Sequence, residues 1–211
     1  MMLIPGRARL VRITALLSVS LYLLSACATT ETSRASSRLE VQEAVGFTIT
    51  EDARVGASVR TDYETALTLL RQGHHDDGVA LLETVAAEAP QFSAPYIDLG
   101  VAYHRAGDLE AAEQNLLLAL GQNFDHPIAH NELGIVYRKT GRFAEARRSY
   151  ENALAIYPGY HFARRNLAIL CDLYLADLDC ALQNYEAYMA TVPSDDEASM
   201  WIADLRLRSG Q

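Results

Sequence analysis

Small and apolar residues recur at a fixed spacing of 34 positions along most of the chain. Shifting the sequence by that distance aligns one column of small residues, one of large residues and one of glycines. These columns are Ala66, Gly100, Gly134 and Ala168, then Leu69, Tyr103, Tyr137 and Cys171, then Gly73, Gly107 and Gly141. A period of this length indicates a repeat architecture, in which each unit is one supersecondary element.

Each unit is predicted to be a pair of antiparallel helices. The recurring glycine ends the first helix by taking a left-handed backbone conformation, and a proline at position 90 or 158 ends the second. Small residues let the two helices approach closely, and large ones fill the gaps between successive pairs. The pattern is clearest from Pro127 to Tyr160, where Pro127 occupies a first helical position that needs no backbone N–H.

These residues resemble the tetratricopeptide repeat family, whose unit is a 34-residue helix-turn-helix. The resemblance implies an all-α fold, a short right-handed α-solenoid of about four units plus a C-terminal capping helix. Helices are expected over 51–194, with units at about 59–92, 93–126, 127–160 and 161–194, and the cap at 195–211. The fourth unit fits only if one residue is inserted between Leu173 and Asp179, so we expect its turn to differ.

The start of the chain has the pattern of a secretory leader. Three arginines precede an apolar run from Ile13 to Leu24, which is too short for the roughly 20 residues that a membrane span needs. The following Leu24-Ser25-Ala26-Cys27 resembles the lipobox of bacterial lipoproteins, which implies a signal peptide over 1–26 and acylation of Cys27. The alternative is that Cys27 merely follows an ordinary cleaved leader.

Under the lipobox reading, the mature protein is anchored in a membrane through lipidated Cys27. Ala28 follows the cysteine, where lipoproteins retained in the inner membrane carry Asp, so we expect the outer membrane and its periplasmic face, with inner-membrane anchoring still open. Residues 27–50 are expected to be the anchor and a flexible tether. Within them, Gly46–Thr50 alternates as a strand would, but we expect no strand partner and an extended segment against the first helices.

Charge and composition narrow the function classes. The formal net charge is −9, and removal of the leader arginines makes the mature chain more acidic, which argues against a nucleic-acid partner. The six histidines lie in turns and at helix starts and do not converge, so no metal site is predicted. Phosphate loops and nucleophile elbows are absent from the sequence. We therefore expect no cofactor, no small-molecule substrate and no enzymatic activity.

Two further cysteines, Cys171 and Cys180, fall in the two helices of the fourth unit. Antiparallel helices can bring them together, and an oxidising compartment would allow a disulfide. The alternative is that both are small residues of the core.

In the tetratricopeptide family the first helix of each unit lines a groove that binds peptides. Carried over by position, the resemblance implies groove residues Ile97, Val101, His104 and Arg105, then Asn131, Ile135, Arg138 and Lys139, then Phe162, Arg165, Asn166 and Ile169. We expect a mixed apolar and basic groove on an acidic protein. It matches only partly the clamp by which some members hold a C-terminal carboxylate.

The expected function is that of an adaptor or assembly scaffold of the cell envelope, of the kind that accompanies pili, secretion systems or envelope complexes. Its partner would be a protein or peptide. A periplasmic chaperone that holds unfolded clients in the same groove is the alternative, and it would have many exchanging clients where an adaptor has one.

Overall fold

The computed structural model describes residues 37–42, 46–51 and 55–210. The chain divides into two units, Met1–Ser33 and Arg34–Gln211, and every described residue belongs to the second. The predicted leader and the predicted lipidation site, Cys27, therefore lie outside the described residues.

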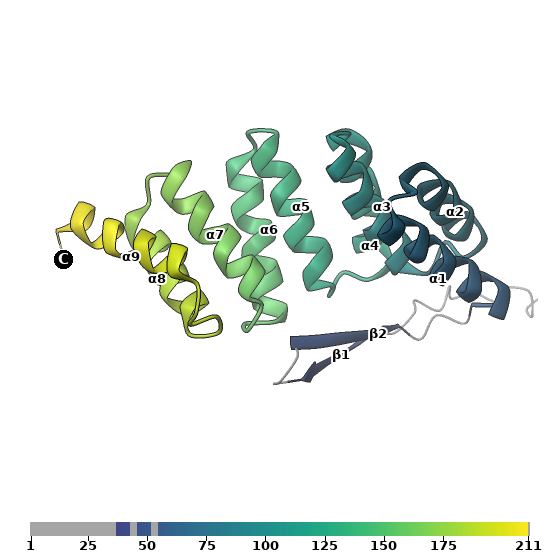
Figure 1. Cartoon of the computed structure of the whole chain (residues 1–211), viewed down its shortest axis with the longest axis horizontal. Helices are drawn as coiled ribbons and strands as arrows, with labels where there is room; N and C mark the ends of the chain where they lie inside the picture. Colours follow the sequence, from purple (N-terminus) through teal and green to yellow (C-terminus); the bar gives the residue numbers. More distant parts are fainter. Residues whose placement is uncertain (1–36, 43–45, 52–54, 211) are drawn as a thin grey trace, which may run out of the picture. The chain divides into compact units, whose positions relative to one another are not determined.

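In the described part of the chain, nine helices follow a two-stranded sheet (Figure 1). They are α1 (Ala57–Gln72), α2 (His75–Glu88), α3 (Ser93–Ala106), α4 (Leu109–Gln122), α5 (Pro127–Lys139), α6 (Phe143–Ile156), α7 (His161–Leu173), α8 (Leu178–Met189) and α9 (Asp196–Ser209). Successive helices form four hairpins, each packed against the next, and α9 packs on α8. The predicted all-α solenoid with a final capping helix is confirmed.

The turns inside the first three hairpins follow the glycine column. Gly73, Gly107 and Gly141 have φ angles of +86°, +89° and +78°, a conformation that costs glycine little and other residues more. The fourth hairpin lacks this glycine, and Ala176 takes the positive φ of 53° in its longer turn. The turn of the fourth hairpin therefore differs from the others, as predicted, because it is longer and has no glycine at the position of positive φ.

The small-residue column lets the helices of a hairpin touch. A Cβ atom on Gly100 would lie 2.6 Å from Leu116 Cγ, and one on Gly134 would lie 2.5 Å from Tyr150 Cε1. Leu116 and Tyr150 are fully buried at these contacts. Interiors this closely packed leave no room for an added methyl group without displacement of a neighbour.

The segment before the helices departs from the prediction. Strand β2 (Gly46–Glu51) pairs antiparallel with strand β1 (Ser37–Gln42), with Leu39 opposite Ile49. The expectation of an unpaired extended segment after a structureless tether is therefore wrong for these residues. The partner strand was missed because the charged and hydroxyl residues around it hide the brief alternation of Leu39 and Val41.

The end of β2 is hydrogen-bonded to the second hairpin through Glu51. Its carboxylate accepts a bond of 3.0 Å from the backbone N–H of Ser93 and another from the Ser93 hydroxyl. The side-chain amide of Asn123 donates to it over 3.3 Å. Phe92, the N-cap residue of α3, makes no side-chain cap, and Glu51 accepts from the first of the backbone N–H groups that have no partner within the helix.

Among the described residues, the helices all fall short of the length and apolar character needed to cross a membrane.

Candidate partner-binding groove

The first helices of the hairpins carry the residues expected to line the groove. Ten of the twelve are half-buried or exposed, and they are Val101, His104, Arg105, Ile135, Arg138, Lys139, Phe162, Arg165, Asn166 and Ile169. The other two depart from the expectation. Ile97 is 6% exposed and Asn131 is 2% exposed, so neither offers its side chain to a partner.

Asn131 instead joins neighbouring repeats. The amide of Asn166 on α7 donates to its side-chain oxygen over 2.9 Å, and its own amide donates to Glu132 Oε1 over 3.0 Å. On the other side of Glu132, Oε2 lies 4.0 Å from Nδ1 of His104 on α3. One polar chain therefore runs through α3, α5 and α7 beneath the groove.

Burial sets the protonation of this polar chain. Desolvation raises the pKa of Glu132, an effect that the hydrogen bond from Asn131 and the charge of Arg105 oppose. For His104, desolvation and then the charges of Lys139, Arg105 and Arg138 lower the pKa, which favours the neutral ring at pH 7. Its Nε2 is buried without a hydrogen-bond partner in the described protein.

Aromatic rings hold two of the groove arginines. The Arg138 guanidinium lies 5.7 Å from the ring centre of Tyr174, and that of Arg165 lies 5.3 Å from the ring of Trp201. Arg165 also pairs with Glu197 at 3.4 Å. In the described structure the Nε of each arginine is buried without a partner. Both side chains are thus oriented before any partner binds, which lowers the entropic cost of binding.

A cleft of about 660 Å³ opens between α1, α2 and α3, next to the groove residues Val101 and Arg105. Its walls combine apolar side chains with Arg71, Arg105 and Asp98. The residues expected for the groove did not include α1, so the cleft was missed. A sequence feature that points to it is the pair Ala102 and Ala106, which align with the larger Val136 and Thr140 of the next unit.

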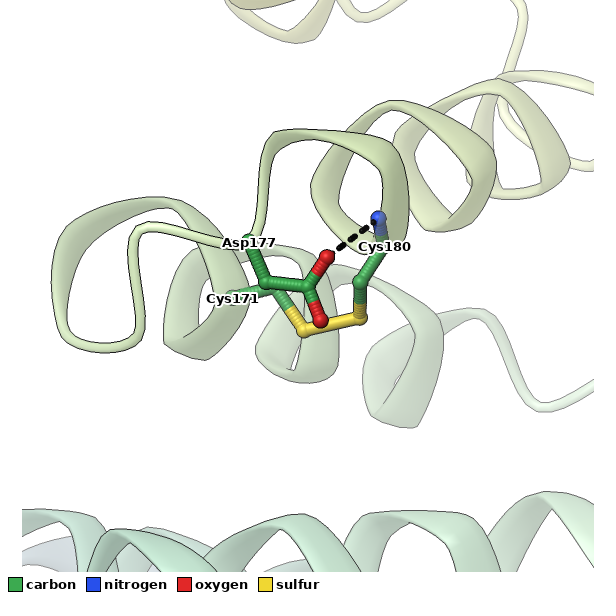
Figure 2. A group of neighbouring side chains, drawn as sticks. All are labelled: Cys171, Asp177 and Cys180. Atoms are coloured by element: carbon green, nitrogen blue, oxygen red, sulfur yellow. Dashed lines mark hydrogen bonds between the residues drawn. A yellow bond between two sulfur atoms is a disulfide. The ribbon is translucent and has the colours of Figure 1, made fainter.

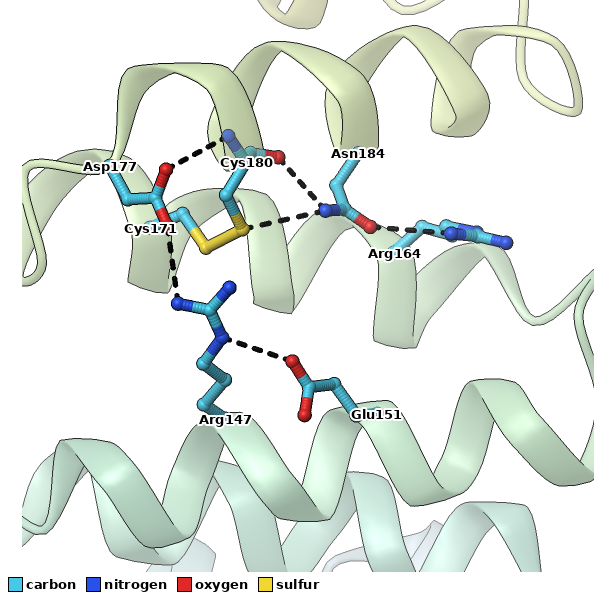
Figure 3. The surroundings of a disulfide bond; sticks show 7 residues. All are labelled: Arg147, Glu151, Arg164, Cys171, Asp177, Cys180 and Asn184. Carbon is cyan, nitrogen blue, oxygen red and sulfur yellow. Dashed lines mark hydrogen bonds and ion pairs between the residues drawn. A yellow bond between two sulfur atoms is a disulfide. The ribbon is translucent and has the colours of Figure 1, made fainter.

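Cys171 and Cys180 form a disulfide that joins α7 to α8 (Figure 2). Asp177 between them accepts a hydrogen bond of 3.1 Å from the Cys180 N–H and caps α8. Arg147 on α6 reaches the same carboxylate at 3.1 Å and tethers the altered turn to the third hairpin (Figure 3).

Ligand atoms of Cys171, Asp177 and Cys180 lie within 4.8 Å of one another, as a metal site would require. In the disulfide, however, neither sulfur is a thiolate, which is the form that binds metals. Two buried histidines have structural partners as well. His126 Nδ1 accepts from the Ala129 N–H at 3.4 Å and caps α5, and His130 Nε2 lies 2.9 Å from the Phe124 carbonyl oxygen.

Two tetratricopeptide repeat family models match the chain, over residues 69–132 and 127–160. A solved tetratricopeptide repeat protein of Thermus thermophilus is 28% identical, with a TM-score of 0.59, and the match covers 71% of this chain and 81% of that one. For pilF of Pseudomonas aeruginosa the identity is 17%, the TM-score 0.65 and the coverage 72% and 68%.

A third similar structure is the first repeat domain of Spaghetti (RPAP3) bound to the HSP90 peptide SRMEEVD. It is 21% identical, with a TM-score of 0.54, and the match covers 56% of this chain and 93% of that one. The matched models and these structures agree with the 34-residue period and the hairpins described above. Residues 69–160 of this chain, over which the two models match, therefore consist of tetratricopeptide repeats.

Proposed function

We propose that this protein is a membrane-anchored adaptor of the bacterial envelope that binds a segment of another protein in the groove of its first helices. The tetratricopeptide fold supports a role in protein–protein interaction. The observation that carries the proposal is the orientation of two groove arginines by aromatic rings, Arg138 by Tyr174 and Arg165 by Trp201.

The rings orient the guanidinium groups of Arg138 on α5 and Arg165 on α7, and both side chains are partly exposed. A peptide supplies carbonyl oxygens and carboxylates, and these accept hydrogen bonds from Arg N–H groups.

The envelope location rests on the sequence of the first 28 residues. The lipobox-like stretch that ends at Cys27 supports acylation, and acyl chains on that residue would hold the domain at a membrane. Ala28 supports the outer membrane over the inner one. The proposed adaptor would thus present its groove to envelope proteins such as components of pili, secretion systems or wall-building complexes.

Site-specific photocrosslinking in intact cells tests the groove. A photoreactive amino acid at Val101, Ile135 or Ile169 is expected to crosslink to one stoichiometric partner. The same amino acid at Gln114 on α4 or Arg148 on α6, both exposed on second helices, is the control. Crosslinks from the control positions alone would refute the groove assignment, and a broad mixture of clients from the groove positions would favour a chaperone.

Metabolic labelling with an alkyne-bearing fatty acid tests the anchor. The protein is expected to take up the label and to fractionate with the outer membrane, whereas a Cys27→Ser variant should lose the label. Equal labelling of both forms, or a Cys27→Ser protein that stays in the membrane, would contradict acylation at Cys27.

A further inference from the structure

The turn of the fourth hairpin interrupts the repeat pattern and brings three ligand-type side chains together. Cys171 takes the column position that Tyr103 and Tyr137 occupy in the two preceding units, so a thiol side chain replaces a phenol ring. The backbone N–H of Asp177 donates to the Cys171 carbonyl oxygen over 2.9 Å, and this bond folds the longer turn back onto the end of α7. The Asp177 carboxylate is thereby held next to the cysteine pair (Figure 2).

The distances among these side chains suit a small divalent cation. One ligand atom each of Cys171, Asp177 and Cys180 lies within 4.8 Å of the others. Ligand atoms that surround one tetrahedral zinc ion at about 2.0–2.3 Å are about 3.3–3.8 Å apart. Zinc accepts both sulfur and carboxylate ligands, whereas calcium and magnesium take oxygen ligands. The set therefore favours zinc once the two sulfurs are free to separate.

Hydrogen bonds already orient two of the three groups. Asp177 Oδ1 accepts from the Cys180 N–H over 3.1 Å, and its Oδ2 lies 3.1 Å from Nη1 of Arg147 (Figure 3). A carboxylate has about four lone-pair positions, so both bonds leave room for a metal ion. The side-chain amide of Asn184 donates to Cys180 Sγ over 3.6 Å, and Arg164 donates to the oxygen of that amide over 3.3 Å. Partners of this kind fix the ligands of metal sites.

Charge also favours a cation at this turn. Two thiolates and one carboxylate carry three negative charges. Arg147 contacts the Asp177 carboxylate but is shared with Glu151, which lies 3.0 Å from it. Cys180 lies in the first turn of α8, where the helix dipole favours a thiolate. The reduced and ionised pair therefore has an excess of negative charge that a divalent cation offsets.

An open pocket leads to the cysteine pair. It has a volume of about 330 Å³, and Cys180 lies in its wall together with Arg147, Glu151 and Asn184. Cys171 is fully buried, whereas Cys180 is partly exposed. A reductant, an ion and a water molecule as fourth ligand can therefore reach the site from the side of Cys180.

We propose that reduction of the disulfide converts this turn into a zinc site, with the Cys171 and Cys180 thiolates and the Asp177 carboxylate as its protein ligands. A dithiol reductant gives two electrons and two protons to the disulfide and becomes a disulfide itself. One zinc ion then replaces the two thiol protons, which pass to solvent. The reverse exchange with a disulfide oxidant expels the ion. The fourth repeat thus holds either a disulfide or a zinc ion, and this inference does not depend on the groove.

Zinc binding by the reduced protein tests the site. The full chain carries Cys27→Ser, so that Cys171 and Cys180 are its only thiols. It is reduced with a phosphine, and zinc is titrated under nitrogen in competition with a chromophoric chelator. The reduced chain is expected to bind one zinc ion, and the oxidised chain should leave all zinc with the chelator. Cobalt(II) in place of zinc should show thiolate-to-metal charge transfer only after reduction.

Two carboxylate variants assign the third ligand. Asp177→Asn keeps a good N-cap residue for α8 but replaces the carboxylate with a neutral amide, so zinc affinity should fall at least tenfold. Asp179→Asn, at an exposed carboxylate in the first turn of the same helix, should leave the affinity unchanged. Zinc should also slow hydrogen exchange in α8 of the reduced chain, because the ion reconnects α7 to α8. It should have no such effect on the oxidised chain.

No zinc binding by the reduced chain would overturn the inference, as would equal effects of Asp177→Asn and Asp179→Asn on the affinity. Equal binding by the oxidised chain would also overturn it, because the zinc would then be held by groups other than the thiols. The variant Cys171→Ser, Cys180→Ser checks the same point, since it should not bind zinc under either condition.

Discussion

The side-chain amide of Asn166 donates a 2.9 Å hydrogen bond to the side-chain oxygen of Asn131 and so links α7 to α5 through groups that are largely shielded from water. The family resemblance places both residues in the groove. The structure makes Asn131 a bridge between repeats, because its amide is occupied by Glu132 as well. Stability in repeat arrays depends on such neighbour interfaces.

Replacing Asn131 with Ala should therefore lower the free energy of unfolding. This loss should exceed any loss of free energy in binding a partner. The change leaves the Asn166 amide and the Glu132 carboxylate without their donor or acceptor in a buried place, at a cost of about 1–3 kcal/mol. Urea unfolding at pH 7 measures it. Asn115→Ala is the control, since that amide bonds only within its own helix and should cost less. Equal costs would contradict the bridging role.

Gly134→Ala should lower the free energy of unfolding by about 1–3 kcal/mol, because the new Cβ overlaps the Tyr150 ring. Gly121→Ala, in a helix position with nothing within 4 Å of the added atom, should raise it by about 0.5–1 kcal/mol. Thermal or urea unfolding of the two variants compares them directly. A stabilised Gly134→Ala protein would show that α5 and α6 can separate without penalty.

These packing contacts explain why so much of the fold was readable from the sequence. Gly134 and Tyr150 lie 16 positions apart in one unit, and the same pairing recurs as Gly100 with Leu116. Contacts between neighbouring repeats are local in sequence, so a fixed period determines them. The hairpin before the helices has no such period, and its link from Glu51 to Ser93 spans 42 residues.

The groove was harder to predict than the fold. Family position assigns Val101, Ile135 and Asn131 alike to the groove. The first two are half-buried, whereas Asn131 is buried and bonded to its neighbour Asn166. The cleft exists because the small side chain of Ala102 leaves space, which the larger Val136 fills at the equivalent position one unit later. Such a void follows from the packing of three helices together, and no single position reveals it.

The stability should fall in acid because of His126. Burial first, and then the neighbouring His130, lower the pKa of His126 from 6.5 to about 4. Between those values the unfolded chain binds the proton and the folded chain does not, so stability is full above pH 6.5 and declines as pH falls toward 4. The loss should reach about 3 kcal/mol at the lower end.

Urea unfolding of the native protein and of His126→Asn at pH 7 and pH 5 measures this contribution. Asn is a good N-cap residue, so the variant keeps the cap of α5 and removes the titrating group. Its stability should change less between the two pH values. An equal pH dependence in both proteins would mean that His126 contributes nothing to acid sensitivity.

Reduction of the Cys171–Cys180 disulfide should destabilise the last repeat without unfolding the first three. The bond closes a short loop of residues 171–180, for which the entropic model gives about 2–3 kcal/mol. The effect should be local, because Asp177 still caps α8 and Arg147 still holds Asp177 after reduction. Hydrogen exchange with and without a reducing agent should show faster exchange in α8 and α9, with α3 to α5 unchanged. The double variant Cys171→Ala, Cys180→Ala should be insensitive to the reductant, and equal acceleration across all repeats would show that the array unfolds as one unit.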